Sequence, residues 1–446
     1  MNHMQNRQWM ILPFIALAIL LAACTTPGAQ AGPLGTSVGA QPTPVSTPAI
    51  AVTPEAGDEG CSLVYAIEGH VYCQRSFAVR QPLATVDGPF VSLALSQDGS
   101  FVAYTVMQDD GTVLLGVVRT DGSGTPLLIG AQQLGSAAVD GLFSPFQLQW
   151  RAGTHLLYFN TIPAFAKGEV DVIMLAGADL YAVNADSGAV KKVVERAGAG
   201  RFALSPDGKR AVLSLPQALE LLDLETGERT HVLAFAPIDN ATPTGYLPRA
   251  DWNSDGTFFN VAIPTGRVFT ADGTATLYRV SADGKVQTLG ALHGSFMAGG
   301  PIEFEFSPDG TQVAYGTFDT TTQVATMHLA LSDGTGDRVI DQIDRDHGLM
   351  GLGWSPDSAL YIYSLLPDGG GVFARLISSG ETFAAGKQVV AAKWTASDSF
   401  VYTDGSALYL YRPGEPMRQV VGGDAGGMLF DVRPEPAAPA TAQSNR

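Results

Sequence analysis

The residues of this chain that could do chemistry include a serine set between two glycines. Gly35-Thr36-Ser37-Val38-Gly39 matches the pattern that holds the nucleophilic serine of many hydrolases. Such a serine needs a strand before it and a helix after it, so that its hydroxyl is exposed on a sharp turn. Residues 25–58 are rich in Thr, Pro, Gly, Ala and Ser and offer neither element. We therefore attribute the motif to composition and expect no catalytic residue there.

Residue types that bind metals are present, but their spacing is not that of a metal site. Asp341, Asp344 and Asp346 precede Gly348, yet they lack the alternating ligands and the distal glutamate of a calcium loop. The histidines after residue 24 show no i,i+4 pair of the kind that forms a helical zinc site. They are His70, His155, His231, His293, His328 and His347. We expect no metal, no other cofactor and no enzymatic activity.

Cys61 and Cys73 could form a disulfide if the chain is exported. If Glu68-Gly69 is a two-residue turn, Cys73 lies opposite Val64, and Cys61 is out of register. A three-residue loop at Ala66–Glu68 would instead put the two cysteines directly opposite each other. Because a disulfide needs Cα atoms within about 7 Å, the sequence leaves the bridge open.

The remaining cysteine, Cys24, follows an export signal. Arg7 is the formal positive charge of a short first region, and the apolar run from Trp9 to Leu21 is short for a membrane-spanning helix. Leu21-Ala22-Ala23-Cys24 resembles a bacterial lipobox. The resemblance implies removal of the signal peptide 1–23, diacylglycerol on Cys24, and a further fatty acid such as palmitate on the new amino terminus. An ordinary signal peptide or an uncleaved anchor is the alternative.

Lipidation would place the protein outside the cytoplasm, held at the outer leaflet of the cell membrane or at an outer membrane where one exists. Two or three acyl chains suffice for stable anchoring. Residues 24–60 then form a disordered tether rich in Pro, Thr and Gly, and the tail 433–446 is also expected to be disordered. The net charge of −17 argues against a nucleic-acid partner.

The remainder of the chain is organised by a repeated turn, of which Phe306–Thr317 is the clearest copy. In Ser-Pro-Asp-Gly, Pro308 presets φ near −65°, Asp309 hydrogen-bonds its own turn, and Gly310 supplies a left-handed residue. β-prone apolar residues flank it on both sides. Related turns occur at 95–99, 204–208, 252–256 and 354–358, with degenerate copies at 150–154 and 394–398. A turn of this kind that recurs along the chain between short strands predicts an all-β fold.

Each repeat contains four strands, A to D, with the turn between A and B. The first B strand, at 63–67, has no A strand before it, and the last A strand, at 428–432, has no B strand after it. Residues 61–432 are therefore predicted to form a single β-propeller of eight four-stranded blades, closed by pairing of the N- and C-terminal strands. Seven blades are the alternative.

These repeats resemble the TolB-type family, a WD-repeat-like propeller whose blades carry an aromatic residue, Ser-Pro-Asp-Gly and an Ala-Tyr-bearing strand. Phe306–Thr317 matches closely, and Trp354–Ser364 differs in having Ser358 where Gly is usual. The resemblance covers most of residues 61–432 and implies the fold. TolB itself carries an additional N-terminal α/β domain, for which no segment is expected here, so the resemblance does not extend to its role.

Loop lengths predict two unequal faces. The A–B and C–D links are short, whereas the insertions lie in B–C and D–A links, which emerge on the opposite face of a propeller. We call these the short-turn face and the long-loop face. The insertions are Gly130–Pro145, Thr161–Ala178, Ala234–Pro248, Pro264–Ala275 and Gly290–Pro301. The candidate partner-binding residues in them are Phe165, Lys167, Glu169, Asp171, Tyr246, Phe269, His293 and Phe296.

The leading hypothesis is a membrane-anchored lipoprotein whose propeller binds an unknown protein or envelope partner through the long-loop face. The alternatives are a sensor for a glycan or small ligand, and a propeller-type hydrolase or lyase. Trp150, Trp252, Trp354 and Trp394 all lie at the end of an A strand. That regular position favours packing between blades over a sugar-stacking platform.

Overall fold

The computed structural model describes fourteen segments of the chain, all within the unit Gly60–Arg446. They are residues 60–75, 79–109, 111–130, 133–134, 143–163, 179–195, 198–238, 246–265, 272–296, 303–344, 348–366, 371–386, 391–422 and 429–433. The predicted signal peptide, Cys24, the tether up to residue 59 and the tail from residue 434 lie outside these segments.

The described residues form 32 strands in eight antiparallel sheets of four, which we call blades I to VIII. Blade I contains β4 (Phe90–Leu95), β5 (Phe101–Met107), β6 (Val113–Arg119) and β7 (Leu127–Ile129). Blade II contains β8 (Phe143–Trp150), β9 (Leu156–Pro163), β10 (Leu180–Asn184) and β11 (Val190–Val194). Blade III contains β12 (Arg201–Leu204), β13 (Arg210–Leu215), β14 (Ala218–Asp223) and β15 (Arg229–Ala234). Blade IV contains β16 (Ala250–Trp252), β17 (Phe258–Thr265), β18 (Thr274–Ser281) and β19 (Val286–His293).

The second half of the ring repeats this order. Blade V contains β20 (Glu305–Phe306), β21 (Gln312–Asp319), β22 (Val324–Leu331) and β23 (Arg338–Asp344). Blade VI contains β24 (Gly348–Trp354), β25 (Leu360–Leu366), β26 (Gly371–Leu376) and β27 (Thr382–Gly386). Blade VII contains β28 (Ala391–Ala396), β29 (Ser399–Thr403), β30 (Leu408–Tyr411) and β31 (Arg418–Val421). Blade VIII contains β32 (Leu429–Val432), β1 (Leu63–Ile67), β2 (His70–Arg75) and β3 (Val79–Thr85).

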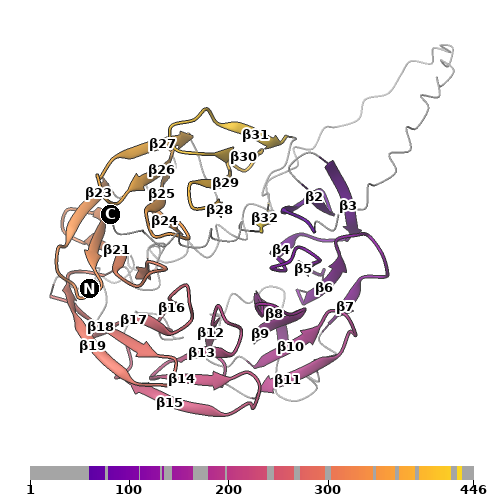
Figure 1. The fold of residues 1–446 in the computed structure, drawn as a ribbon, viewed down its shortest axis with the longest axis horizontal. Helices are drawn as coiled ribbons and strands as arrows, with labels where there is room; N and C mark the ends of the chain where they lie inside the picture. The colour runs from indigo at the N-terminus through magenta and orange to yellow at the C-terminus, as the bar shows by residue number, and fades with distance from the viewer. Residues whose placement is uncertain are drawn as a thin grey trace, which may run out of the picture. The chain divides into compact units, whose positions relative to one another are not determined.

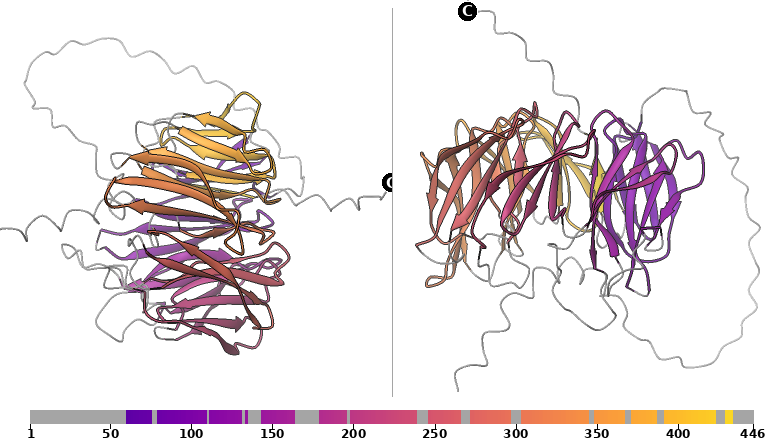
Figure 2. Two further views of the ribbon diagram at one scale, coloured as in Figure 1. Left: turned by 90° about the vertical axis from the view of Figure 1, so that its left-hand side faces the viewer. Right: turned by 90° about the horizontal axis from the view of Figure 1, so that it is seen from below.

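The blades follow one another around a ring, with the first strand of each repeat innermost (Figure 1). β4, β8, β12, β16, β24, β28 and β32 line the inside, and the last strands lie at the rim (Figure 1). Seen from the side, the strands of a blade run between the two faces of the ring (Figure 2). The fold is an eight-bladed β-propeller, as the repeats predicted.

Ring closure joins the two ends of the repeat array. β1 pairs with β32 in an antiparallel register from Leu63 opposite Val432 to Ala66 opposite Leu429. The N-terminal hairpin therefore belongs to the ring, which confirms eight blades and excludes seven. Closure removes the two exposed edges that an open array would leave at its first and last strands.

The repeated turn is held by its own side chains. In the four turns with serine, the Ser hydroxyl donates to the Asp carboxylate two residues later at 2.6–2.7 Å. In the clearest copy the same carboxylate accepts the Thr311 backbone N–H at 3.0 Å, and Gly310 is left-handed with φ of 71°. The prediction that Asp309 and its equivalents hold their own turns is confirmed.

The four tryptophans pack between blades, as their regular spacing predicted. Each indole N–H donates to a backbone carbonyl on the innermost strand of the preceding blade. The pairs are Trp150 with Ala94 (3.1 Å), Trp252 with Ala203 (3.1 Å), Trp354 with Glu305 (3.0 Å) and Trp394 with Gly353 (3.2 Å). Each tryptophan thus fills the gap between two sheets and also donates a hydrogen bond to a carbonyl on the edge strand of the neighbouring sheet.

Candidate functional site

The links between strands differ in length at the two ends of the blades. Every link between the first and second strands is short, from 96–100 in blade I to 397–398 in blade VII. The long links join β7 to β8 (130–142), β9 to β10 (164–179), β15 to β16 (235–249) and β19 to β20 (294–304). All four open on the long-loop face, and all belong to blades I to V.

Three of the eight residues predicted to bind a partner lie in described segments. His293 is exposed, and its Nδ1 lies 3.3 Å from the Thr274 hydroxyl. Tyr246 and Phe296 are only 2% exposed. Both pack in the core around blades III to V, with Phe296 against the rings of Phe304 and Tyr315. As surface contacts these two predictions are wrong, because their aromatic rings anchor the long links to the core. Phe165, Lys167, Glu169, Asp171 and Phe269 lie outside the described segments.

Cys61 and Cys73 form a disulfide with a Cα–Cα distance of 5.7 Å. The hairpin has the two-residue turn, since Ile67 pairs with His70 and Val64 lies opposite Cys73. The disulfide forms although the two cysteines are not opposite each other in the strand register. Cys61 precedes β1, so the pairing of β1 with β2 does not fix its position. Its N–H instead donates to Gly99 O in the first turn of blade I at 2.9 Å.

Five charged residues lie close together on the innermost strands of blades III to V and on the residues just before those strands. Arg201 pairs with Glu303 at 2.5 Å, and Arg249 pairs with Asp251 at 2.7 Å. Arg249 also donates to Glu305, which accepts the Tyr361 hydroxyl of blade VI at 2.9 Å. We call Arg201, Arg249, Asp251, Glu303 and Glu305 the inner-wall cluster. It connects four consecutive blades.

Burial and neighbouring charges shift the pKa values of Arg249 and of the two tyrosines beside the cluster. Burial disfavours the charged form of Arg249, but the carboxylates of Asp251 and Glu305 outweigh it and raise the pKa of the guanidinium. Burial and the Glu305 charge raise the pKa of the Tyr361 hydroxyl, which therefore stays protonated and donates. The pKa of Tyr246 is likewise raised, by burial and by the charge of Glu303. Its hydroxyl is buried and has no hydrogen-bond partner among the described residues.

Two apolar side chains are exposed on the innermost strands of blades I and II. Val91 is 38% exposed and Phe146 is 39% exposed. Each sits where the strand pairing slips, between Phe90 and Ser92 and between Pro145 and Leu148. Such bulges redirect a side chain from its regular alternation. The two residues occupy the same position of adjacent repeats, at the end of the strand nearer the long-loop face.

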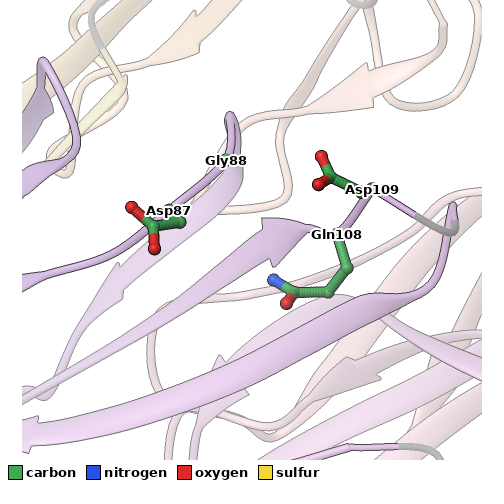
Figure 3. Close-up of a pocket in the computed structure, with 4 residues that line it drawn as sticks. All are labelled: Asp87, Gly88, Gln108 and Asp109. Atoms are coloured by element: carbon green, nitrogen blue, oxygen red, sulfur yellow. The ribbon is translucent and has the colours of Figure 1, made fainter.

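A hollow of about 330 Å³ lies on the long-loop face, beside the link between β3 and β4. Asp87 and Gly88 come from that link, and Gln108 and Asp109 come from the link between β5 and β6 (Figure 3). Both carboxylates are exposed to solvent. We assign this hollow no ligand.

The arrangement closest to a catalytic one lies on the short-turn face. His155 Nε2 is 2.9 Å from Asp98, and its Nδ1 is 2.8 Å from Asp186. The nearby Ser96 hydroxyl donates to Asp98 and not to the histidine, so the group does not form a nucleophile–base pair. The hydrogen bond to Asp98 is the main cause that raises the pKa of His155, which favours an imidazolium joining blades I and II.

Within the described segments, no three His, Cys, Asp or Glu side chains are grouped so that they could hold a metal ion. Nor does this part of the chain contain a helix long and apolar enough to cross a membrane.

The inner-wall cluster was not predicted from the sequence, because its members come from different repeats. A signal was present. Arg201, Arg249 and Glu303 each lie three residues before the position occupied by the repeat aromatic or leucine, in three consecutive repeats. Aligned repeats would therefore have shown charged residues at an inner-strand position that is uncharged in the other five.

No protein-family model and no curated protein matches the sequence. Among solved structures, the chain matches TolB from Acinetobacter baumannii at 14% identity and a TM-score of 0.33, over 62% of this chain and 63% of that one. It matches an oligogalacturonate lyase from Vibrio parahaemolyticus at 13% identity and a TM-score of 0.45, over 75% and 86%. It matches a prolyl endopeptidase at 12% identity and a TM-score of 0.48, over 79% and 55%. The chain thus spans less than two thirds of the TolB and endopeptidase chains. At these identities the likeness concerns the fold alone.

Proposed function

We propose that the protein is a non-catalytic lipoprotein, anchored outside the cytoplasm through Cys24, whose propeller binds a protein partner of the cell envelope through its long-loop face. The supporting observation is where the chain enters and leaves the ring. The Cys61 N–H donates to Gly99 O, and Arg433 Nη1 donates to Asp98 O, both at 2.9 Å. Both chain ends of the propeller are thus attached to one turn of the short-turn face.

The long-loop face lies at the opposite ends of the strands. The tether continues from Gly60, and the long links all emerge at the other ends of the strands. A protein held by its short-turn face presents its long loops away from the attachment. Loops carried on a rigid scaffold are where binding residues concentrate. The described ends of these loops are fixed by buried side chains such as Leu134 and Tyr246, so less ordering is needed on binding.

Capture from detergent-solubilised membranes tests the binding face. The variant replaces residues 165–177 with a short Gly/Ser link between β9 and β10. The control carries Lys209→Glu and Lys285→Glu, whose side chains are 76% and 84% exposed on the short-turn face. A partner that is captured by the wild type and the control but lost from the loop variant supports the proposal. The same partners on all three proteins would contradict it.

Anchoring is tested separately with Cys24→Ser. If the thiol carries the lipid, the variant leaves the membrane fraction and no longer incorporates labelled palmitate. Unchanged fractionation would remove the anchor from the proposal and leave the partner question intact.

A further inference from the structure

The inner-wall cluster offers hydrogen-bonding groups that water can reach. The side chains of Arg201 and Arg249 are each 32% exposed, and those of Glu303, Asp251 and Glu305 are 19%, 14% and 11% exposed. The two guanidiniums donate and the three carboxylates accept, so the cluster holds both kinds of group side by side. Because each carboxylate is already paired with an arginine, the planar groups are held in place before a ligand arrives.

The charge balance of this cluster favours an uncharged ligand. Two arginines and three carboxylates leave a formal charge of −1, on a chain whose net charge is −17. An anionic ligand would be repelled, and a cation would compete with arginines that already neutralise the carboxylates. Hydroxyl groups suit the cluster better, because each hydroxyl both donates and accepts a hydrogen bond.

One polar group beside the cluster lacks a partner. Tyr246 is 2% exposed, and its hydroxyl is buried without a hydrogen bond among the described residues. The hydroxyl feels the charges of Glu303 and Arg201, which are the strongest electrostatic influences on it after burial. Leaving a buried hydroxyl unpaired is unfavourable. The hydroxyl is covered in the unliganded protein, so a ligand hydroxyl at the Arg201–Glu303 pair supplies the missing partner once a small side-chain movement uncovers it.

An exposed aromatic ring adjoins the same wall. Phe146 on β8 is 39% exposed, and the next residue, Gln147, donates to Phe202 O at 2.7 Å. Phe202 follows Arg201 on β12, so Phe146 and Arg201 lie on neighbouring innermost strands, each next to a residue of this hydrogen bond. A ligand with one apolar face and several hydroxyls can cover the ring and bond the cluster at the same time.

We propose that the inner wall of blades II to V binds a neutral saccharide, which stacks on Phe146 and bonds the inner-wall cluster through its hydroxyls. The residues that carry the proposal are Phe146, Arg201, Tyr246, Arg249, Asp251 and Glu303. Tyr246, Arg249 and Glu303 lie at the ends of two long links, next to the innermost strands, but the site does not include the β9–β10 link and does not depend on the lipid. The proposal therefore goes beyond the envelope-partner function, and either proposal can fail while the other holds.

Calorimetry and saturation-transfer NMR on the full-length protein in detergent provide the test. The neutral probes are maltotriose, cellotriose and triacetylchitotriose, and the charged probe is trigalacturonate. Phe146→Ala removes the stacking ring, and Tyr246→Phe removes only the unpaired hydroxyl. Val91→Ala is the matched control, because it truncates an equally exposed side chain at the same repeat position of blade I.

At least one neutral trisaccharide is expected to bind. Phe146→Ala should weaken it about tenfold, Tyr246→Phe should weaken it about fivefold, and Val91→Ala should leave it unchanged. Tyr246→Phe should not lower the melting temperature, since its hydroxyl has no partner to lose. The proposal would be overturned by a saccharide affinity that is unchanged in both Phe146→Ala and Tyr246→Phe, by binding of trigalacturonate alone, or by no binding of any neutral probe.

Discussion

The carbonyl of Glu305 accepts the indole N–H of Trp354 at 3.0 Å, and its carboxylate accepts the hydroxyl of Tyr361 at 2.9 Å. The same carboxylate binds Arg249 of blade IV. Glu305 thus joins its own blade to the blades on both sides: its carbonyl and carboxylate both accept from blade VI, and the carboxylate also accepts from Arg249 of blade IV. In this propeller the polar groups of the inner wall are also part of what holds the ring together.

The contact of His155 with Asp98 makes the junction of blades I and II sensitive to pH. The pKa of His155 is raised above its ordinary 6.5, mainly by its hydrogen bond to Asp98. Burial opposes ionisation of Asp98, but hydrogen bonds from Ser100, Ser96 and His155 outweigh it and lower its pKa from 3.8. The histidine contribution is therefore complete below pH 6.5 and is lost as the pH rises through its raised pKa. The aspartate contribution is complete above pH 3.8 and is lost on acidification.

We expect His155→Gln to destabilise the protein by less than about 1 kcal/mol between these limits, because the pair is partly exposed. The free-energy difference between wild type and variant should shrink as the pH is raised from about 6 to about 9. Urea unfolding across that range measures it. A difference that stays constant with pH would show that the imidazole, not the imidazolium, makes the contact.

The Cys61–Cys73 bridge is expected to stabilise the blade that closes the ring. It closes a loop with a sequence separation of 12 residues, for which chain entropy alone gives about 3 kcal/mol. Reduction should lower the free energy of unfolding by roughly this amount. The Cys61→Ser/Cys73→Ser variant should be equally weakened and should not respond to reductant. A wild type that unfolds identically with and without reductant would contradict the prediction.

Ser358 occupies the position that glycine fills in the other Asp-containing turns, with φ of 64°. A left-handed conformation costs a residue with a side chain about 1 kcal/mol relative to glycine. The Ser358 hydroxyl, however, accepts the backbone N–H of Asp309 from blade V at 3.0 Å. This bond between blades offsets the strain and gives a physical reason for the departure from the repeat motif.

Two substitutions separate strain from bonding at this position. Ser358→Ala keeps the strain and loses the bond, so it should destabilise by about 1–2 kcal/mol. Ser358→Gly loses the bond but relieves the strain, and should lie within about 0.5 kcal/mol of wild type. Thermal unfolding of the two variants side by side gives the order. An alanine variant as stable as the wild type would mean that the hydrogen bond contributes nothing, and one as stable as the glycine variant would mean that there is no strain to relieve.

The architecture was predictable because it is repeated. Turn chemistry such as that of Ser307 to Gly310 recurs in blades I, III, IV and VI, and the unmatched strands at the two ends indicate closure. The inner wall was not predictable in the same way. Arg201 and Glu303 lie in blades III and V, and nothing local to either sequence shows that their side chains meet at 2.5 Å.

The loop residues show the complementary limit. Tyr246 and Phe296 were predicted to face a partner because they lie in long insertions of variable length. Their rings are instead buried, since an inserted link gains stability by returning an aromatic side chain to the core. Insertion length thus identified the elaborated face but not which residues of each loop are available on it.

The inner-wall cluster is expected to act as a unit in stability as well as in binding. Arg249 carries two ion pairs, to Asp251 and Glu305, and Arg249→Met leaves both carboxylates without their counter-charge. The free energy of unfolding should fall by about 2 kcal/mol, which is less than for a fully buried pair because the arginine is partly exposed.

A double-mutant cycle of Arg249→Met with Glu305→Gln should give a coupling of about 1 kcal/mol or more by urea unfolding. The exposed pair Lys285–Asp283, which is also within ion-pair distance at 2.7 Å, is the control and should show no measurable coupling. Equal coupling in the two cycles would mean that the inner wall is solvated like the outer surface.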